Sequence, residues 1–189
     1  MSDILQRALS DAASTFRSLE KFSREIDQAA DLIAASLTSG GQLLACGNGG
    51  SAADVADFTT EFACRFMGDR RPYPALNLSM GGSLLTATGN DYSFEEIFAR
   101  QVRAFGRPGD TLVAISTSGK SKNIRRALEQ AKNGQLKSIA LLGRDGGECA
   151  RIADVDLIVP GNATARIQEA HKFLLHVICE IVEPRLARD

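Results

Sequence analysis

The sequence predicts an α/β fold, a doubly wound parallel sheet of five strands flanked by helices and preceded by a helical arm. Short apolar runs recur along the chain, helical patterns separate them, and glycine-rich or polar turns follow them. This alternation is typical of βαβ units, in which helices cover both faces of a parallel sheet. With 189 residues, 44% of them hydrophobic, we expect a single domain over residues 1–189, made of an arm (1–40) and an α/β core (41–189).

The arm is expected to be helical because residues 4–37 contain no Gly or Pro and apolar residues recur every three or four positions. One long helix and two helices with a break between Ser14 and Ser18 both fit this pattern. Gly40 and Gly41 end the segment. The apolar stripe of the arm must be buried, either on its own domain or on a partner subunit.

The core follows in order. Strands are expected at 43–46, 75–79, 111–115, 138–142 and 157–159, and helices at 52–66, 83–88, 123–132 and 164–186, with a short one opened by Gly146 and Gly147. A further helix is expected to begin at Ser93, which has capping-box spacing to Glu96, and to end near Gly106. Ligands of such folds bind beyond the carboxyl ends of the strands.

Two polar loops fall at that edge. The first, from Gly47 through Asn48 and Gly49 to Ser51, leads into a helix for which Ser51 has the spacing of an N-cap and Asp54 that of its partner. A helix start of this kind favours a phosphate or carboxylate, although glycines there also serve packing alone.

The second loop carries four hydroxyl groups, from Ser116, Thr117, Ser118 and Ser121. Hydroxyls and main-chain N–H groups suit a phosphate monoester, and a loop that merely caps a helix is the alternative. The spacing excludes a P-loop, since no Gly lies five residues before Gly119, and the first loop lacks the third glycine of a dinucleotide fingerprint.

Charged and polar residues on two helices are further candidates. Asp57, Glu61 and Arg65 share a helix face, either as a solvated charge row or with a carboxylate acting as a general base. His176 lies on the apolar stripe of the last helix, eight residues after Gln168, and is either a core residue or a functional one. We expect His171 to be the more exposed histidine. Asp57, Glu61, Gln168 and His176 could together bind a divalent metal if the two helices converge.

Composition gives no support to several other classes of protein. The 22 basic and 23 acidic residues nearly cancel, so nothing indicates a nucleic-acid partner. No apolar run has the length of a membrane span and the N-terminus lacks signal-peptide features, so we expect a cytoplasmic protein without a membrane partner. The four cysteines are widely spaced and are expected to be reduced and mostly buried.

Taken in order, several motifs resemble the sugar isomerase (SIS) domain family, and within it the bacterial phosphoheptose isomerases. They are the two loops, Glu61 with Arg65, the run from Gly89 to Tyr92, the run from Asp145 to Gly147, and the stretch from Ala165 to Glu169 with His176. The likeness extends from about Gln42 to Glu183, and the helical arm is also typical of the family.

The resemblance implies a homotetramer with active sites at subunit interfaces. It also implies an intramolecular oxidoreductase that converts sedoheptulose 7-phosphate to D-glycero-D-manno-heptose 7-phosphate for lipopolysaccharide or other surface glycans. By analogy, Glu61 and His176 form the acid/base pair of an enediol mechanism. The substrate-binding residues would be Asn48, Gly49, Ser51, Arg65, Asn90, Asp91, Ser116, Thr117, Ser118, Ser121 and Gln168.

One departure from the family concerns zinc. Many members carry His where this chain has Asp57, and some bind zinc through that His with the residues that match Glu61, Gln168 and His176. Zinc ligation by Asp57 therefore stays open. The alternative function is a non-catalytic SIS-domain protein that senses a sugar phosphate or binds a replication initiator. The presence of both Glu61 and His176 favours the enzyme.

Overall fold

The sheet contains five parallel strands in the order β2-β1-β3-β4-β5 in a computed structural model that describes residues 3–187. The strands are β1 (Leu43–Gly47), β2 (Ala75–Asn77), β3 (Thr111–Ser116), β4 (Lys137–Gly143) and β5 (Val155–Val159). Every residue of β1 and β3 is buried, as expected for central strands of a sheet covered on both faces. The expected doubly wound fold is confirmed.

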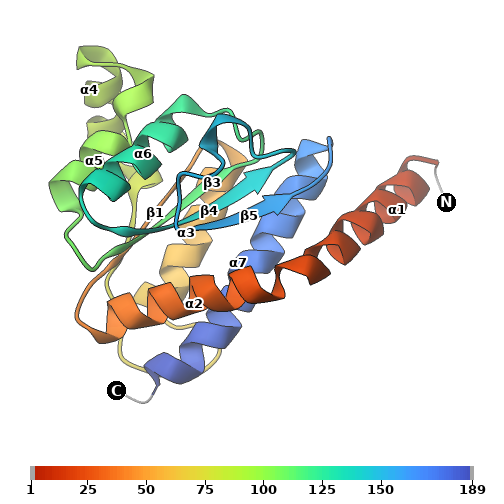
Figure 1. Cartoon of the computed structure of the whole chain (residues 1–189), viewed down its shortest axis with the longest axis horizontal. Helices are drawn as coiled ribbons and strands as arrows, with labels where there is room; N and C mark the ends of the chain where they lie inside the picture. Colours follow the sequence, from red (N-terminus) through yellow and green to blue (C-terminus); the bar gives the residue numbers. More distant parts are fainter. Residues whose placement is uncertain (1–2, 188–189) are drawn as a thin grey trace.

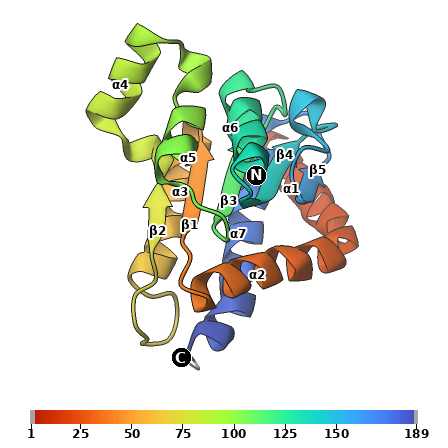
Figure 2. The same ribbon diagram turned by 60° about the vertical axis from the view of Figure 1, so that its left-hand side comes forward.

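Helices form a layer on each face of the sheet (Figures 1 and 2). The core on one face includes α2 (Ser23–Thr38), α3 (Gly50–Ala63) and α7 (Thr164–Leu186). The core on the other includes α5 (Ala99–Phe105) and α6 (Lys122–Asn133), and α4 (Gly82–Asp91) stands at the end of this layer. Within residues 3–187, no helix is long and apolar enough to cross a membrane.

The arm consists of α1 (Asp3–Arg17), a 3-10 segment η1 (Ser18–Phe22) and α2. The break lies at the end of the expected interval, and it lets Leu19 and Phe22 turn into the core. The Ser18 hydroxyl donates to the Thr15 carbonyl at 2.6 Å at this point. By contrast, α1 buries none of its own residues and extends away from the sheet along the start of α7 (Figure 1).

Two expected capping boxes are wrong. The Ser93 side chain makes no cap hydrogen bond within the described part of the chain, and a 3-10 turn η3 (Phe94–Glu96) precedes α5, so two short segments replace one helix. At the first loop, α3 already begins at Gly50, after Gly49 with φ of 55°. Ser51 therefore lies inside the helix instead of capping it.

Candidate active site

The two polar loops lie side by side at the carboxyl edge of the sheet. β1 and β3 are neighbours, and Gly47 at the end of β1 is in register with Ile115 in β3. The amides of Asn48 and Asn123 join the loops, since each side-chain nitrogen donates to the other side-chain oxygen at 2.9 Å. Ser116 at the end of β3, and Thr117, Ser118 and Ser121 in the loop that follows it, thus lie on the strand–loop unit next to that of Asn48.

The hydroxyl loop is tightly folded. The Ser116 hydroxyl lies 3.0 Å from that of Ser121 and accepts the Gly119 N–H at 3.1 Å. The Ser118 hydroxyl accepts the Lys120 N–H at 3.1 Å. Gly119 is required here, because it has φ of +66° and a Cβ would lie 2.3 Å from the Gly146 carbonyl group. The loop therefore holds several hydroxyls close together beneath the Gly146 turn.

The beginning of α3 is covered by α7. A Cβ on Gly50 would lie 2.5 Å from the Gln168 amide, so glycine at this position admits the Gln168 side chain. Ser51 is 5% exposed, and its N–H donates to the Asn48 carbonyl at 3.0 Å. The structure thereby brings Gln168 to the loop that contains Asn48, Gly49 and Ser51.

Asp54, one turn into α3, is a buried acid that the sequence suggested only as a cap. It is 7% exposed, and its Oδ2 atom is buried without a hydrogen-bond partner in the described residues. Burial raises the pKa of Asp54, while the Lys172 ammonium and the Gln168 amide lower it. Asp57, the next acid on this face, is exposed and forms an ion pair with Lys172.

The two histidines have the reverse of the expected exposures. His171 is fully buried, and its Nε2 lies 3.1 Å from the Leu142 carbonyl in β4. Burial lowers the pKa of His171 to about 4, so it is a neutral core residue at pH 7. His176 is half-buried, with its ring centroid 6.1 Å from that of Phe66. The expectation for His171 is wrong because this residue lies on the face of α7 that packs directly against the sheet.

Glu61 is half-buried on the side of α3 that faces α7. Its charge contributes to raising the pKa of the buried Cys179, three residues after His176, although burial is the main cause. Glu61 thus lies near the α7 segment that carries His176. Arg65, beyond the end of α3, is exposed and donates to the Met67 carbonyl at 3.3 Å. Glu61 is ten positions after Ser51 on the helix, which is about 15 Å along the axis.

Asn90 and Asp91 lie apart from these residues. Both are exposed at the end of α4, and the Asn90 amide donates to the Asp91 carboxylate at 2.8 Å. α4 belongs to the helical layer opposite α3 and α7 (Figure 2). One chain therefore brings together the two loops, Gln168 and the α3–α7 face, and leaves Asn90, Asp91 and Arg65 outside that group.

The donor set expected for zinc does not fit the metal in this arrangement. The Asp57 carboxylate is occupied by the Lys172 ammonium, which adds a positive charge beside the other candidate ligands. Across residues 3–187, no group of three or more His, Cys, Asp or Glu side chains is placed to hold a metal ion. Asp57, Glu61 and His176 are therefore not assembled as ligands.

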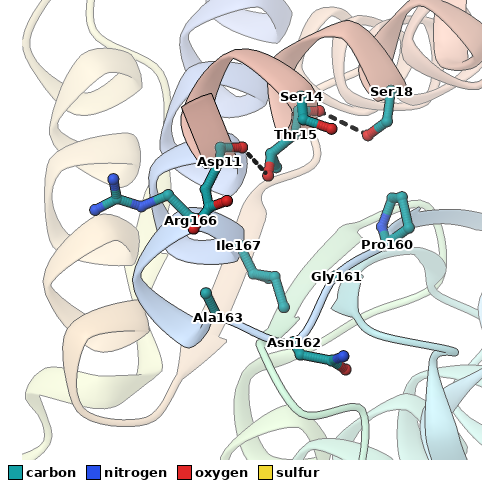
Figure 3. Close-up of a pocket in the computed structure, with 10 residues that line it drawn as sticks. All are labelled: Asp11, Ser14, Thr15, Ser18, Pro160, Gly161, Asn162, Ala163, Arg166 and Ile167. Carbon is teal, nitrogen blue, oxygen red and sulfur yellow. Dashed lines mark hydrogen bonds between the residues drawn. The ribbon is translucent and has the colours of Figure 1, made fainter. Parts of the chain in front are cut away.

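A separate pocket lies between the arm and the start of α7 (Figure 3). Hydroxyl groups line it, but Thr15 donates to the Asp11 carbonyl at 2.9 Å and Ser18 to that of Thr15. Arg166 at its rim donates to the Ala8 carbonyl and pairs with Glu169. None of the expected site residues lines this pocket.

Sequence reasoning missed three residues of this region, namely Asn123, Asp54 and Lys172. Asn123 is two residues after Ser121, the last residue of the hydroxyl loop, and could have been included as its continuation. Lys172 lies four residues after Gln168 and four before His176, so helical spacing alone places it on their face. Asp54 is three residues before Asp57 on α3, so helical spacing likewise places it on the same face as Asp57.

Comparison with known proteins agrees with this architecture. Residues 9–143 match the SIS domain family. The chain is 47% identical over 176 residues to a protein named phosphoheptose isomerase from Bordetella avium, covering 92% of this chain and 89% of that one. It is 42% identical over 188 residues to one of the same name from Helicobacter pylori strain P12, covering 99% and 98%.

A solved structure gives the same result. The phosphoheptose isomerase GmhA from Neisseria gonorrhoeae superposes with a TM-score of 0.90 at 41% sequence identity, over 96% of this chain and 98% of that one. The similarity therefore includes the arm as well as the α/β core.

Proposed function

The chain belongs to the SIS domain family, and from this we propose that it is an aldose–ketose isomerase of sedoheptulose 7-phosphate. The product would be D-glycero-D-manno-heptose 7-phosphate. The observation that carries the proposal is the similarity to phosphoheptose isomerases over nearly the whole of both chains. The site is consistent with it, since two polar loops meet at one sheet edge beside a helical face with acids, an amide and an imidazole.

The phosphate of the substrate would bind at the two loops. Ser51, Ser116, Thr117, Ser118 and Ser121 supply hydroxyls, and the first turn of α3 supplies the positive end of a helix dipole. Asn48, Gly49 and Gln168 are adjacent and would contact the sugar. Asn90, Asp91 and Arg65 are assigned to the sugar by resemblance.

Isomerisation needs a base for carbon and a proton shuttle for oxygen. In our proposal the Glu61 carboxylate removes a proton from C1, electrons of the C–H bond form the C1=C2 bond, and His176 protonates the C2 oxygen to give the enediol. His176 then takes the proton from the C1 oxygen as the C1 carbonyl forms, and Glu61 returns its proton to C2. Each group ends as it began.

A homotetramer with sites at subunit interfaces is part of the proposal. The distance of about 15 Å along α3 between Ser51 and Glu61 supports it, because a second chain could then supply part of each site. The separation of Asn90 and Asp91 from the α3–α7 face supports it as well.

Zinc is not part of this proposal, because the Asp57 carboxylate already forms an ion pair with the Lys172 ammonium. A cytoplasmic location and a role in lipopolysaccharide assembly follow from the proposed activity.

The test is incubation of the full chain with sedoheptulose 7-phosphate, with isomer formation followed by NMR. We expect turnover by the native chain and a loss of 10²- to 10⁴-fold in kcat for Glu61→Gln, which removes a general base. Asp69→Asn, a matched acid-to-amide change at an exposed position outside the site, is the control and should leave kcat unchanged. Absence of turnover by the native chain, with and without added zinc, would refute the proposed function.

A further inference from the structure

α7 presents a lysine to the acidic face of α3. Gln168, Lys172 and His176 follow one another at steps of four residues on α7, and Asp54, Asp57 and Glu61 follow at steps of three and four on α3. The Lys172 ammonium contacts the Asp57 carboxylate. The Lys172 side chain is 27% exposed and that of Asp57 is 64% exposed, so the lysine is the inner member of the pair.

A second observation indicates that a cation belongs here. Asp54 is nine-tenths buried, and its Oδ2 atom has no hydrogen-bond partner in the described residues. A buried carboxylate with an unpartnered oxygen is unfavourable unless a positive charge lies close by. Among the nearby charged side chains, the Lys172 ammonium has the strongest effect on Asp54, and it lowers the pKa of that carboxyl.

Resting on the function proposed above, we propose that Lys172 is the resident cation of this site, paired with Asp57 and close enough to Asp54 for its charge to act on it, so that the enzyme works without a bound divalent metal. An ammonium has three donors and one fixed charge, which suits two carboxylates and an amide oxygen. A divalent ion placed beside it would be repelled and would have to displace it from Asp57. Lys172 is thus a positioning residue that fixes the Asp57 and Asp54 side chains beside Gln168.

The zinc content of the folded protein tests this directly. The full chain is incubated with excess ZnCl2, desalted, and analysed for zinc per chain, as native protein and as Lys172→Met/Asp57→His. We expect native protein to retain far less than one zinc per chain and the double variant to retain close to one, since it gains an imidazole ligand and loses the competing charge. Lys137→Met removes a different Lys–Asp pair, with Asp154, and should behave as native.

Activity gives a second readout. We expect EDTA to leave native turnover unchanged, and Lys172→Met to lose about 10- to 100-fold in kcat/KM, with partial rescue in Lys172→Arg. Native protein that keeps close to one zinc and loses activity with EDTA would overturn the proposal. So would equally low zinc in native and double variant, both confirmed as folded by circular dichroism. Zinc content decides the role of Lys172 whatever the turnover, whereas absent turnover overturns the proposed function alone.

Discussion

At the scale of single residues, the two histidines show how burial assigns different roles to one side chain. The His171 ring stays neutral at neutral pH, because burial disfavours its protonated form. Its Nε2 already donates to the Leu142 carbonyl. Its Nδ1 atom is buried and has no partner among residues 3–187, so protonation there would leave a buried N–H without an acceptor. His176 is half-buried and keeps access to the surface of α7.

This difference predicts how stability changes with pH. The pKa of His171 falls from 6.5 to about 4 on folding, so the unfolded state binds more protons between these values. The contribution of His171 is therefore fully present above pH 6.5 and is lost as the pH falls towards 4, by up to about 3 kcal/mol. Urea unfolding of native protein and His171→Leu should show that native protein loses its advantage over the variant across this range. A constant difference from pH 7 to pH 4 would contradict the assignment.

At the scale of elements, Gly119 joins two loops that follow different strands. Its carbonyl accepts the Cys149 N–H at 3.0 Å, and its Cα faces the Gly146 carbonyl group so closely that no side chain fits. The hydroxyl loop after β3 and the turn after β4 therefore form one unit at the sheet edge. A change in this contact should affect both.

We predict that Gly119→Ala lowers stability by about 2 to 4 kcal/mol, the sum of strain at positive φ and a backbone clash. Gly109→Ala is the matched control, because Gly109 has φ of +97° and no atom of residues 3–187 lies within 4 Å of an added Cβ. It should cost only the strain, about 1 kcal/mol. Thermal unfolding of both variants measures the difference in stability. Equal losses of stability would contradict a steric clash between the added Cβ and the Gly146 carbonyl group.

The expectations from sequence were accurate for elements and less so for their ends. The five strands and their parallel pairing were expected because short apolar runs, such as Thr111 to Ile115, alternate with helical patterns. The helix start at Gly50 could not be read from spacing, since the positive φ of Gly49 sets it and Ser51 also fits the cap pattern. Similarly, the Asp57–Lys172 pair needs the crossing of α3 and α7, which no local pattern contains.

At the scale of the whole molecule, α1 is the feature that a single chain leaves incomplete. Its apolar residues, including Ile4, Leu5 and Leu9, are exposed, and Phe16 packs edge-on against the half-exposed Phe173, with ring centroids 5.1 Å apart. An apolar helix stripe of this kind is stabilised when another surface covers it. The proposed homotetramer would supply that surface from a second copy of the chain.

We therefore predict that Leu9→Glu lowers the assembly state. A carboxylate on the stripe would have to be desolvated at the subunit interface, which is unfavourable without a partner. Light scattering coupled to size exclusion should give a tetramer for native protein and a smaller species for the variant. Ser10→Glu adds the same charge at an exposed position on the side of α1 away from the apolar stripe, and this variant should stay tetrameric.

If sites lie at interfaces, Leu9→Glu also loses isomerase activity at low protein concentration and regains it as concentration rises. Native protein that is monomeric and fully active would contradict the interface site and leave the α3–α7 face of one chain to perform the reaction.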